Sequence, residues 1–281
     1  MMKKSNAILF ALACAGTAAL AYFAVNEKIS LKTYPIYSGK IKTPVKILQI
    51  SDLHSSNYGC EGSELIEAAT NISPDIIVLT GDILDDCAPN GACFRFLKKL
   101  ASLYPCYYVS GNHEVYTHLV GAIKEKLISY GIRVLEGETE TVNIGDQSIV
   151  IGGVDDPIES PDKYGRLWED QLTDCGRSLD GECFSILLCH RPELISYYEE
   201  TPFDLVLCGH AHGGQVIIPK LLNGLYAPHQ GLLPKYAGGE YVMGNGGKMI
   251  VSRGLSKLVR PRVFNRPELL LVTLLPSGEK E

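Results

Sequence analysis

The most informative stretch is Val45-Lys-Ile-Leu-Gln-Ile-Ser-Asp-Leu-His54, where an apolar run ends abruptly in an Asp-Leu-His triplet. A short apolar run followed by polar residues is typical of a buried β-strand. In open α/β-type sheets, ligand-binding side chains gather at the carboxyl ends of the strands. We therefore expect a strand over residues 45–50 whose end presents Asp52 and His54 to a ligand.

Four further apolar runs end in polar motifs of the same kind. They cover residues 76–80, 107–110, 185–189 and 205–208. The motifs that follow them are Gly81-Asp82, Gly111-Asn112-His113-Glu114, His190 and Gly209-His210-Ala211-His212. Because ligand groups collect where strands end, we expect these side chains to converge on one spot. A mixed set of carboxylates, an amide and imidazoles indicates a metal site.

The sequence between these motifs predicts helices that alternate with strands. The first expected helix starts at Ser63 and ends before Pro74. Four further helices are expected near 93–103, over 119–130, around Trp168 and over 192–198. A hairpin is expected over 139–154, closing strands over 248–252 and 268–275, and a glycine-rich loop over 213–247. This mixture of helix–strand units and consecutive strands predicts an α+β fold with helices outside a sandwich of sheets.

The N-terminal residues predict a membrane anchor. Residues 7–25 carry no charge and follow Lys3 and Lys4. About 20 apolar residues span the core of a bilayer, so we expect a transmembrane helix over residues 1–25. A signal peptide cleaved near Ala19-Leu20-Ala21 is the alternative interpretation.

The chain after the anchor divides into a predicted linker, residues 26–44, and a folded domain, residues 45–281. A short basic N-terminus before an early apolar run favours a domain on the outer side of the cell membrane. The four lysines of the linker favour the opposite orientation. The linker's net charge of +3 also suits contact with anionic headgroups.

Charge and cysteine content narrow the function classes. The predicted domain holds 20 basic and 31 acidic residues, a net charge of −11, which argues against binding nucleic acid.

The nine cysteines include no Cys-x-x-Cys pair and no zinc-finger spacing. Cys189 and Cys208 end buried-looking strands, so packing is favoured over a redox role. The cysteines expected in loops or at the ends of elements, which could pair if the domain is exported, are Cys60, Cys87, Cys93, Cys175 and Cys183.

The ordered series D-x-H, G-D, G-N-H-E, H and G-H-x-H resembles the signature of the calcineurin-like metallophosphoesterase superfamily, over about residues 45–275. The resemblance implies a four-layer α/β/β/α sandwich of two mixed sheets flanked by helices. It implies a first metal held by Asp52, His54 and His212, a second held by Asn112, His190 and His210, and Asp82 bridging both. It also implies that His113 is the general acid at the leaving group.

Flanking residues resemble one branch of that superfamily. Cys189-His190-Arg191-Pro192, Gly213-Gly214-Gln215, Ser252-Arg253-Gly254 and the segment 264–268 are similar to the bacterial YkuE/YaeI-like group of membrane-associated or exported phosphoesterases. The group's twin-arginine export signal is absent from this sequence. The expected cofactors are two divalent metal ions, with Mn first and Fe or Zn as alternatives, since the expected ligands are oxygen and nitrogen atoms.

The leading hypothesis is a membrane-anchored phosphoesterase in which a metal pair about 3.5–4 Å apart activates water. Its expected partner is a phosphate ester, and a lipid- or envelope-derived ester is the narrower expectation. One alternative is a pyrophosphatase acting on a lipid or nucleotide sugar. An alternative of another class is a non-catalytic metal-binding scaffold.

Several residues outside the signature keep two interpretations. Glu114 either orients His113 or is a solvated loop carboxylate. Arg191 either meets a substrate phosphate or forms a structural ion pair. Asp155 and Asp156 either rim the pocket or lie in a surface turn. No role is assigned to His118 and His229.

Overall fold

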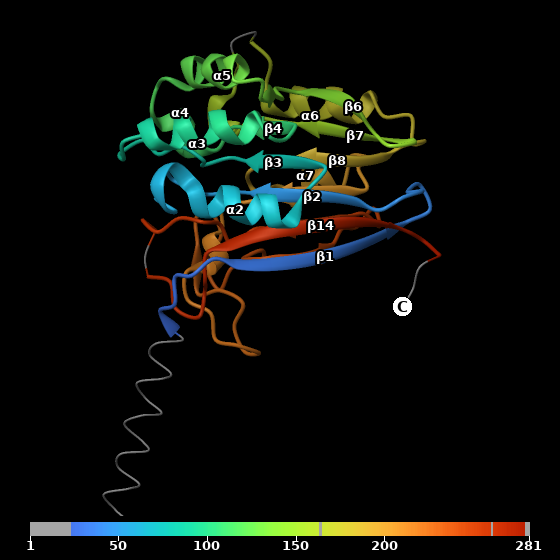
Figure 1. Ribbon diagram of the computed structural model, residues 1–281. Helices are drawn as coiled ribbons and strands as arrows, with labels where there is room; N and C mark the ends of the chain where they lie inside the picture. Colours follow the sequence, from blue (N-terminus) through green and yellow to red (C-terminus); the bar gives the residue numbers. More distant parts are fainter. Residues whose placement is uncertain (1–23, 163–164, 260, 279–281) are drawn as a thin grey trace, which may run out of the picture.

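The computed structural model describes residues 24–162, 165–259 and 261–278, and these form two six-stranded sheets flanked by helices (Figure 1). The first sheet has the order β1-β14-β2-β3-β4-β5 and the second β12-β13-β9-β8-β7-β6. The first consists of β1 (Ser30–Ser38), β14 (Glu268–Pro276), β2 (Val45–Ile50), β3 (Ile76–Thr80), β4 (Cys106–Val109) and β5 (Arg133–Val134). The second consists of β12 (Gly239–Val242), β13 (Lys248–Val251), β9 (Leu205–Cys208), β8 (Phe184–Leu188), β7 (Gln147–Gly153) and β6 (Glu138–Ile144).

Both sheets are mixed. Strands β2 to β5 run parallel in the first sheet, and β7, β8, β9 and β13 run parallel in the second. Antiparallel pairs join β14 to β2, β12 to β13 and β6 to β7. The helices are α2 (Ser63–Ile72), α3 (Gly91–Ala101), α4 (Asn112–Tyr116), α5 (Val120–Ser129), α6 (Trp168–Arg177) and α7 (Ile195–Tyr198). Short 3₁₀ turns are η1 (Cys60–Gly62), η2 (Pro157–Glu159), η3 (Pro192–Leu194) and η4 (His212–Gly214).

Alternation along the strands builds three hydrophobic layers. In β2, Ile47 packs between the two sheets, while Leu48 and Ile50 pack under the helices α2 and α3. A third layer fills the space between the second sheet and α6 and α7, where Trp168 and Tyr198 are buried. Because successive strand residues face opposite sides, each central strand joins two layers. The predicted α/β/β/α sandwich is therefore confirmed.

The predicted linker over residues 26–44 is wrong, because residues 30–38 form strand β1. This strand lies at the edge of the first sheet and pairs in parallel with β14 over its whole length. Pro35 lies within it, and proline is tolerated on an edge strand, where one row of N–H groups needs no partner. Only Ile36 is fully buried, so the strand carries little local signal and is fixed by residues some 240 positions later.

The glycine-rich segment after His212 is also more ordered than expected. Residues 239–242 form the edge strand β12, and β10 (Tyr226–Ala227) pairs with β11 (Gly231–Leu232) in a separate two-stranded ribbon. No helix in the described part of the chain is long and apolar enough to cross a membrane. The predicted anchor over residues 1–25 lies outside the described residues except for Ala24 and Val25.

Candidate metal centre

The candidate ligands follow the carboxyl ends of five strands, three in the first sheet and two in the second. Asp52 follows β2, Asp82 follows β3 and Asn112 begins α4 just after β4. His190 follows β8, and the Gly-His-Ala-His segment follows β9. The two groups are tied together, because the backbone N–H of His210 donates to Asp52 Oδ1 at 2.8 Å. The convergence expected from the sequence is therefore observed.

The chain turns sharply where these side chains begin. Five candidate ligands have positive φ angles between 47° and 68°, namely Asp52, His54, Asp82, His210 and His212. Such left-handed backbone is uncommon outside glycine and clusters at functional sites. Gly81 has a φ of 82°, and a Cβ there would lie 2.5 Å from His190 Nδ1. Glycine at this position lets the second sheet's histidine approach the end of β3.

The acidic and imidazole side chains form two groups that share Asp82. One contains Asp52, His54, Asp82 and His212, and the other contains Asp82, His190 and His210. Within each group, one ligand atom per residue lies within 4.8 Å of the others. Asp82 Oδ2 lies 3.1 Å from His190 Nε2 and 3.6 Å from His54 Nε2. A carboxylate common to two donor groups has the arrangement of a two-metal site.

The donor atoms themselves fit cations. The buried atoms Asp52 Oδ2, His54 Nε2, Asp82 Oδ2, Asn112 Oδ1 and His212 Nδ1 have no hydrogen-bond partner among the described residues. An unpaired buried polar atom is rare because it costs about 1–3 kcal/mol. Four of these atoms belong to residues of one donor group, and all five are oxygen or nitrogen, which matches the coordination chemistry of Mn, Fe or Zn. The residues present therefore fit a pair of divalent ions.

Two histidines have their outer nitrogen fixed. His190 Nδ1 lies 2.8 Å from the Thr80 carbonyl oxygen, and His54 Nδ1 lies 2.9 Å from Asp85 Oδ2. Each outer nitrogen can then donate its proton to that oxygen, so Nε2, which faces Asp82, would be the atom that binds a cation. Metal-binding histidines usually hold their rings in this way.

The charges of the site support a carboxylate at Asp82. Burial opposes its ionisation, but His190 and His54 hold the pKa of Asp82 well below its usual value. Burial lowers the pKa of His210 and of His212, so these imidazoles stay neutral. Burial also works against a charged His190, yet Asp82 raises the pKa of His190. An ionised Asp82 beside neutral His210 and His212 is the state that a cation requires of its ligands.

His113 lies beside the two donor groups and is more accessible than they are. Its side chain is 29% exposed, and its ring centroid lies 4.3 Å from that of His54. Its backbone N–H donates to Asp82 Oδ1 at 2.8 Å, which fixes the start of α4 over the site. Its Nδ1 lies 2.6 Å from Asp86 Oδ1. The contact holds the ring so that Nε2 is free to meet another molecule.

Glu114 follows neither of its two predicted interpretations. It is fully buried and accepts four backbone N–H groups, those of Asp82, Ile83, Leu84 and Gly111. Burial and the nearby Asp82 raise the pKa of Glu114 to about 7, while its backbone donors oppose that rise. Glu114 therefore ties the loop after β3 to the loop after β4.

The other undecided residues form structural ion pairs. Arg191 is buried and donates to both carboxylate oxygens of Asp156, at 2.7 and 3.0 Å, as the structural interpretation expected. Asp155 is buried as well, with Oδ1 2.8 Å from Lys124 Nζ. The surface-turn interpretation of Asp155 and Asp156 is therefore wrong, because both pair with buried cations.

His229 is a neighbour of the site that the sequence did not single out. Its Nδ1 lies 2.9 Å from His210 Nε2, and the two rings stack with centroids 5.1 Å apart. Glu193 lies near both rings, at 3.9 Å from each. His229 is 17 residues beyond His212 in a segment of irregular pattern, so no spacing rule could identify it.

The cysteines show no disulfide among the described residues. Cys189 and Cys208 are buried in the layer under α7 with their Sγ atoms 3.2 Å apart, as packing predicted. Cys93 and Cys175, expected in loops or at the ends of elements, lie on the buried faces of α3 and α6.

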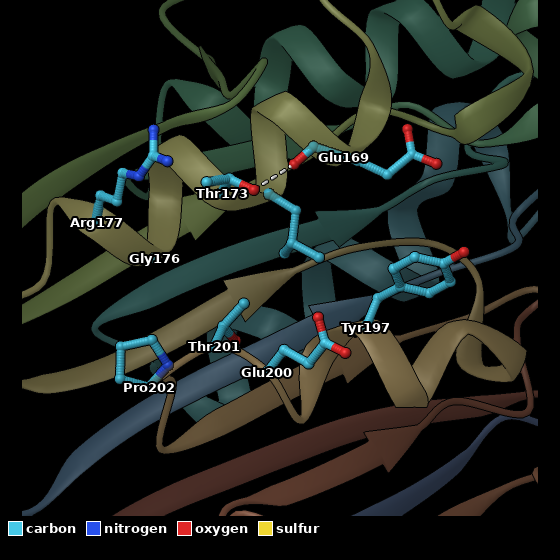
Figure 2. A pocket seen from close by; sticks show the side chains of 9 residues that line it. Glu169, Thr173, Gly176, Arg177, Tyr197, Glu200, Thr201 and Pro202 are labelled. Carbon is cyan, nitrogen blue, oxygen red and sulfur yellow. Dashed lines mark hydrogen bonds between the residues drawn. The ribbon is translucent and has the colours of Figure 1, made fainter.

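A surface hollow lies apart from these residues. It opens between α6 and the segment around Glu200, and Figure 2 shows Glu169, Thr173 and Arg177 on one side of it and Tyr197, Glu200 and Pro202 on the other. No candidate ligand lines it. The hollow is therefore separate from the strand-end cluster.

Comparison with known proteins agrees with this geometry. The profile of the calcineurin-like phosphoesterase family matches residues 45–214. The chain is 32% identical over 237 residues to the metallophosphoesterase YkuE of Bacillus subtilis, covering 82% of this chain and 78% of that one. It is 30% identical over 241 residues to the phosphodiesterase YaeI of Escherichia coli, covering 83% of each.

A solved structure shares the fold. The crystal structure of TT1561 of Thermus thermophilus superposes with a TM-score of 0.50 at 16% identity, over 76% of this chain and 92% of that one. The family profile spans more than half of the chain and includes every candidate ligand, and both relatives are matched over more than two thirds of this chain. The chain therefore belongs to the calcineurin-like phosphoesterase family and is a hydrolase of phosphoric ester bonds.

Proposed function

We propose that this protein hydrolyses a phosphodiester, with phosphomonoesters as weaker substrates, at a pair of divalent cations. The observation that carries the proposal is the pair of donor groups sharing Asp82, with five buried donor atoms that lack partners. The name of YaeI, a phosphodiesterase, supports the choice of a diester.

The ligands divide between the two positions as follows. Asp52, His54 and His212 would hold one cation, Asn112, His190 and His210 the other, and Asp82 both. When bound, such a pair lowers the pKa of a water molecule and neutralises charge on a phosphoryl group. Mn is the cation we propose, since the donor set contains carboxylate, amide and imidazole but no thiolate.

His113 is proposed as the general acid. Its Nδ1 is held by Asp86, so its Nε2 can carry a proton toward the oxygen of the leaving alcohol. The ring is partly exposed and adjoins His54, which supports this role at the accessible side of the site. General acids of this kind contribute about 10²–10⁴-fold to the rate.

The proposal also includes an anchor and a location. Residues 7–25 are long and apolar enough to span a bilayer, and the basic N-terminus before them favours an extracytoplasmic domain. Protease treatment of intact cells tests the location, since only an external domain is degraded while the membrane stays sealed.

The activity is tested with bis-p-nitrophenyl phosphate and p-nitrophenyl phosphate, with added Mn and with a chelator. The expected result is turnover that needs the metal, is faster for the diester, and is abolished in Asp82→Ala. His113→Ala should be strongly impaired. Equal rates with chelator and in both variants would overturn the proposed mechanism.

A further inference from the structure

One surface of the domain is unusually apolar. We define the leucine hairpin as residues 216–233, which include the β10–β11 ribbon. Leu221, Leu232 and Leu233 are 85%, 74% and 66% exposed. Ile218, Leu225 and Tyr226 of the same segment are exposed as well. Six of the eighteen exposed large apolar side chains among the described residues thus lie in this one hairpin. Contiguous apolar exposure of this kind marks an interaction surface.

The hairpin is built onto the candidate metal centre. The N–H of Leu225 donates to the Gly214 carbonyl, two residues after His212, and the N–H of Leu233 donates back to Leu225. His229 lies in the turn of the ribbon and stacks on His210. The imidazole side of the hairpin therefore contacts the site while its leucines face outward.

The hairpin also lies where the chain leaves its N-terminal apolar segment. Val216 pairs with Val263, and the N–H of the next residue, Phe264, donates to the carbonyl of Ala24. Figure 1 shows the orange loops below the sheets, on the same side as the blue start of the described chain. A bilayer entered by residues 7–25 would thus meet this end of the domain.

The charge of this end suits a lipid surface. Residues 216–239 contain Lys220 and Lys235 and no acidic residue, in a domain whose net charge is −11. Both lysines are exposed and flank the leucines. Anionic headgroups attract such residues, and exposed leucines gain free energy by entering the acyl boundary.

We propose that the leucine hairpin dips into the membrane surface, so that the metal centre acts on phosphate esters carried by the bilayer. The proposal rests on the proposed function for the reaction and on the hairpin for the substrate class, an amphiphilic phosphoric ester. His229 is the residue through which the lipid-facing hairpin meets the site.

Tryptophan depth measurements test the hairpin directly. The chain has one tryptophan, Trp168, which is buried and gives a constant background. The full chain carrying Leu232→Trp is reconstituted into phosphatidylcholine–phosphatidylglycerol vesicles whose acyl chains are brominated. We expect the bromine to remove most of the added emission and the emission maximum to shift to shorter wavelength.

The matched control is Ile128→Trp. Ile128 is an exposed apolar residue on α5, which Figure 1 places at the opposite end of the molecule. Its emission should be unaffected by brominated lipid. Leu221→Trp provides a second hairpin position in case Leu232→Trp melts at a lower temperature than the wild type.

Other outcomes overturn the proposal. Emission at both hairpin positions that brominated lipid leaves unchanged would remove the membrane contact. If the added emission is already blue-shifted without lipid, the leucines are covered by another part of the chain or by a second copy of the protein rather than by lipid. The proposed function fails by a separate readout, the absence of Mn-dependent hydrolysis by the wild type, which leaves the quenching result valid.

Discussion

The two sheets contribute different chemistry to one site. The first supplies both carboxylates, the amide, His54 and the proposed proton donor, whereas the second supplies only imidazoles, His190, His210 and His212. Among the candidate ligands, the negative charge that attracts cations therefore comes from the first sheet alone. The second sheet completes the coordination and, through the segment after His212, borders the hairpin. Substitution of a first-sheet ligand should therefore abolish metal binding and turnover. Substitution of a residue that contacts the second sheet's histidines from outside should change metal affinity only moderately.

The difference between the two sheets also extends to their supports. On the first, Glu114 fixes two ligand loops through four backbone hydrogen bonds. On the second, His210 is met from outside by His229, a partly exposed side chain on a surface ribbon. The first-sheet ligands are therefore held by buried hydrogen bonds. The second-sheet ligand His210 is supported by a side chain whose position depends on the surface ribbon.

Asp82→Asn should give the largest effect. The substitution removes the charge shared by the two donor groups, so the chain should bind less than one Mn equivalent in place of two. Changes to residues that merely support ligands cost about 10–100-fold, so loss of this ligand should lower turnover by more than about 100-fold. Elemental analysis measures the bound metal, and hydrolysis of bis-p-nitrophenyl phosphate measures turnover.

Asp146→Asn is the matched control, since Asp146 is an exposed aspartate in the turn between β6 and β7. It should bind metal and turn over substrate like the wild type. An Asp82→Asn protein that keeps both metals would contradict the assignment of a shared carboxylate.

His113→Asn should come next, with an effect that depends on the leaving group. Loss of a general acid costs about 10²–10⁴-fold, and the cost falls when the departing oxygen is stable as an anion. We expect a larger loss for an alkyl ester than for the p-nitrophenyl ester, with metal content unchanged.

His118→Asn serves as the control for His113→Asn. His118 is exposed, lies five residues further along and contacts none of the candidate ligands in the described structure. Equal losses for alkyl and p-nitrophenyl esters would assign His113 a role other than protonating the leaving group.

The sequence predicted residues that carry a local signal better than elements whose position is set by distant segments. Asp52, Asp82 and Asn112 each follow a short apolar run, and this local signal survives without knowledge of the fold. The edge strand β1 was missed because its partner β14 lies at the other end of the chain. His229 was missed because its position depends on how an irregular glycine-rich segment folds back onto His210.

Burial explains a second class of error. For Asp155 and Asp156 the sequence favoured a surface turn, and for Glu114 a solvated loop position was one of two interpretations. Each is buried against N–H groups or a cation supplied from other segments, such as Lys124 and Arg191. Apart from Gly111, which lies three residues before Glu114, these partners lie 30 or more positions away, so no sequence spacing identifies them.

Glu114→Gln should have a larger effect on the free energy of unfolding than on the rate of hydrolysis. Each carboxylate oxygen accepts two backbone N–H groups, and the amide nitrogen that replaces one oxygen leaves two donors unpaired. Each unpaired buried donor costs about 1–3 kcal/mol. The free energy of unfolding in urea should fall accordingly, with a modest loss of turnover because the loop carrying Asp82 loosens. Unchanged stability would mean that water replaces the lost acceptor.

His229→Gly should have the smallest effect. It tests whether His229 supports His210 as a metal ligand. The backbone at His229 has a φ of 58°, which glycine adopts freely, so the change removes the ring without backbone strain. His210 then loses the partner of its Nε2 atom, and Mn affinity at the position proposed for Asn112, His190 and His210 should fall about tenfold.

The control is His118→Gly, because His118 has the same φ of 58° and no contact with the site. Calorimetric Mn titration should separate the two variants, with His118→Gly matching the wild type. If both variants bind Mn like the wild type, the contact between His229 and His210 carries no ligand support. His229 would then act only on the side of the ester, and the Michaelis constant of His229→Gly for a vesicle-borne ester should rise while that for bis-p-nitrophenyl phosphate stays constant.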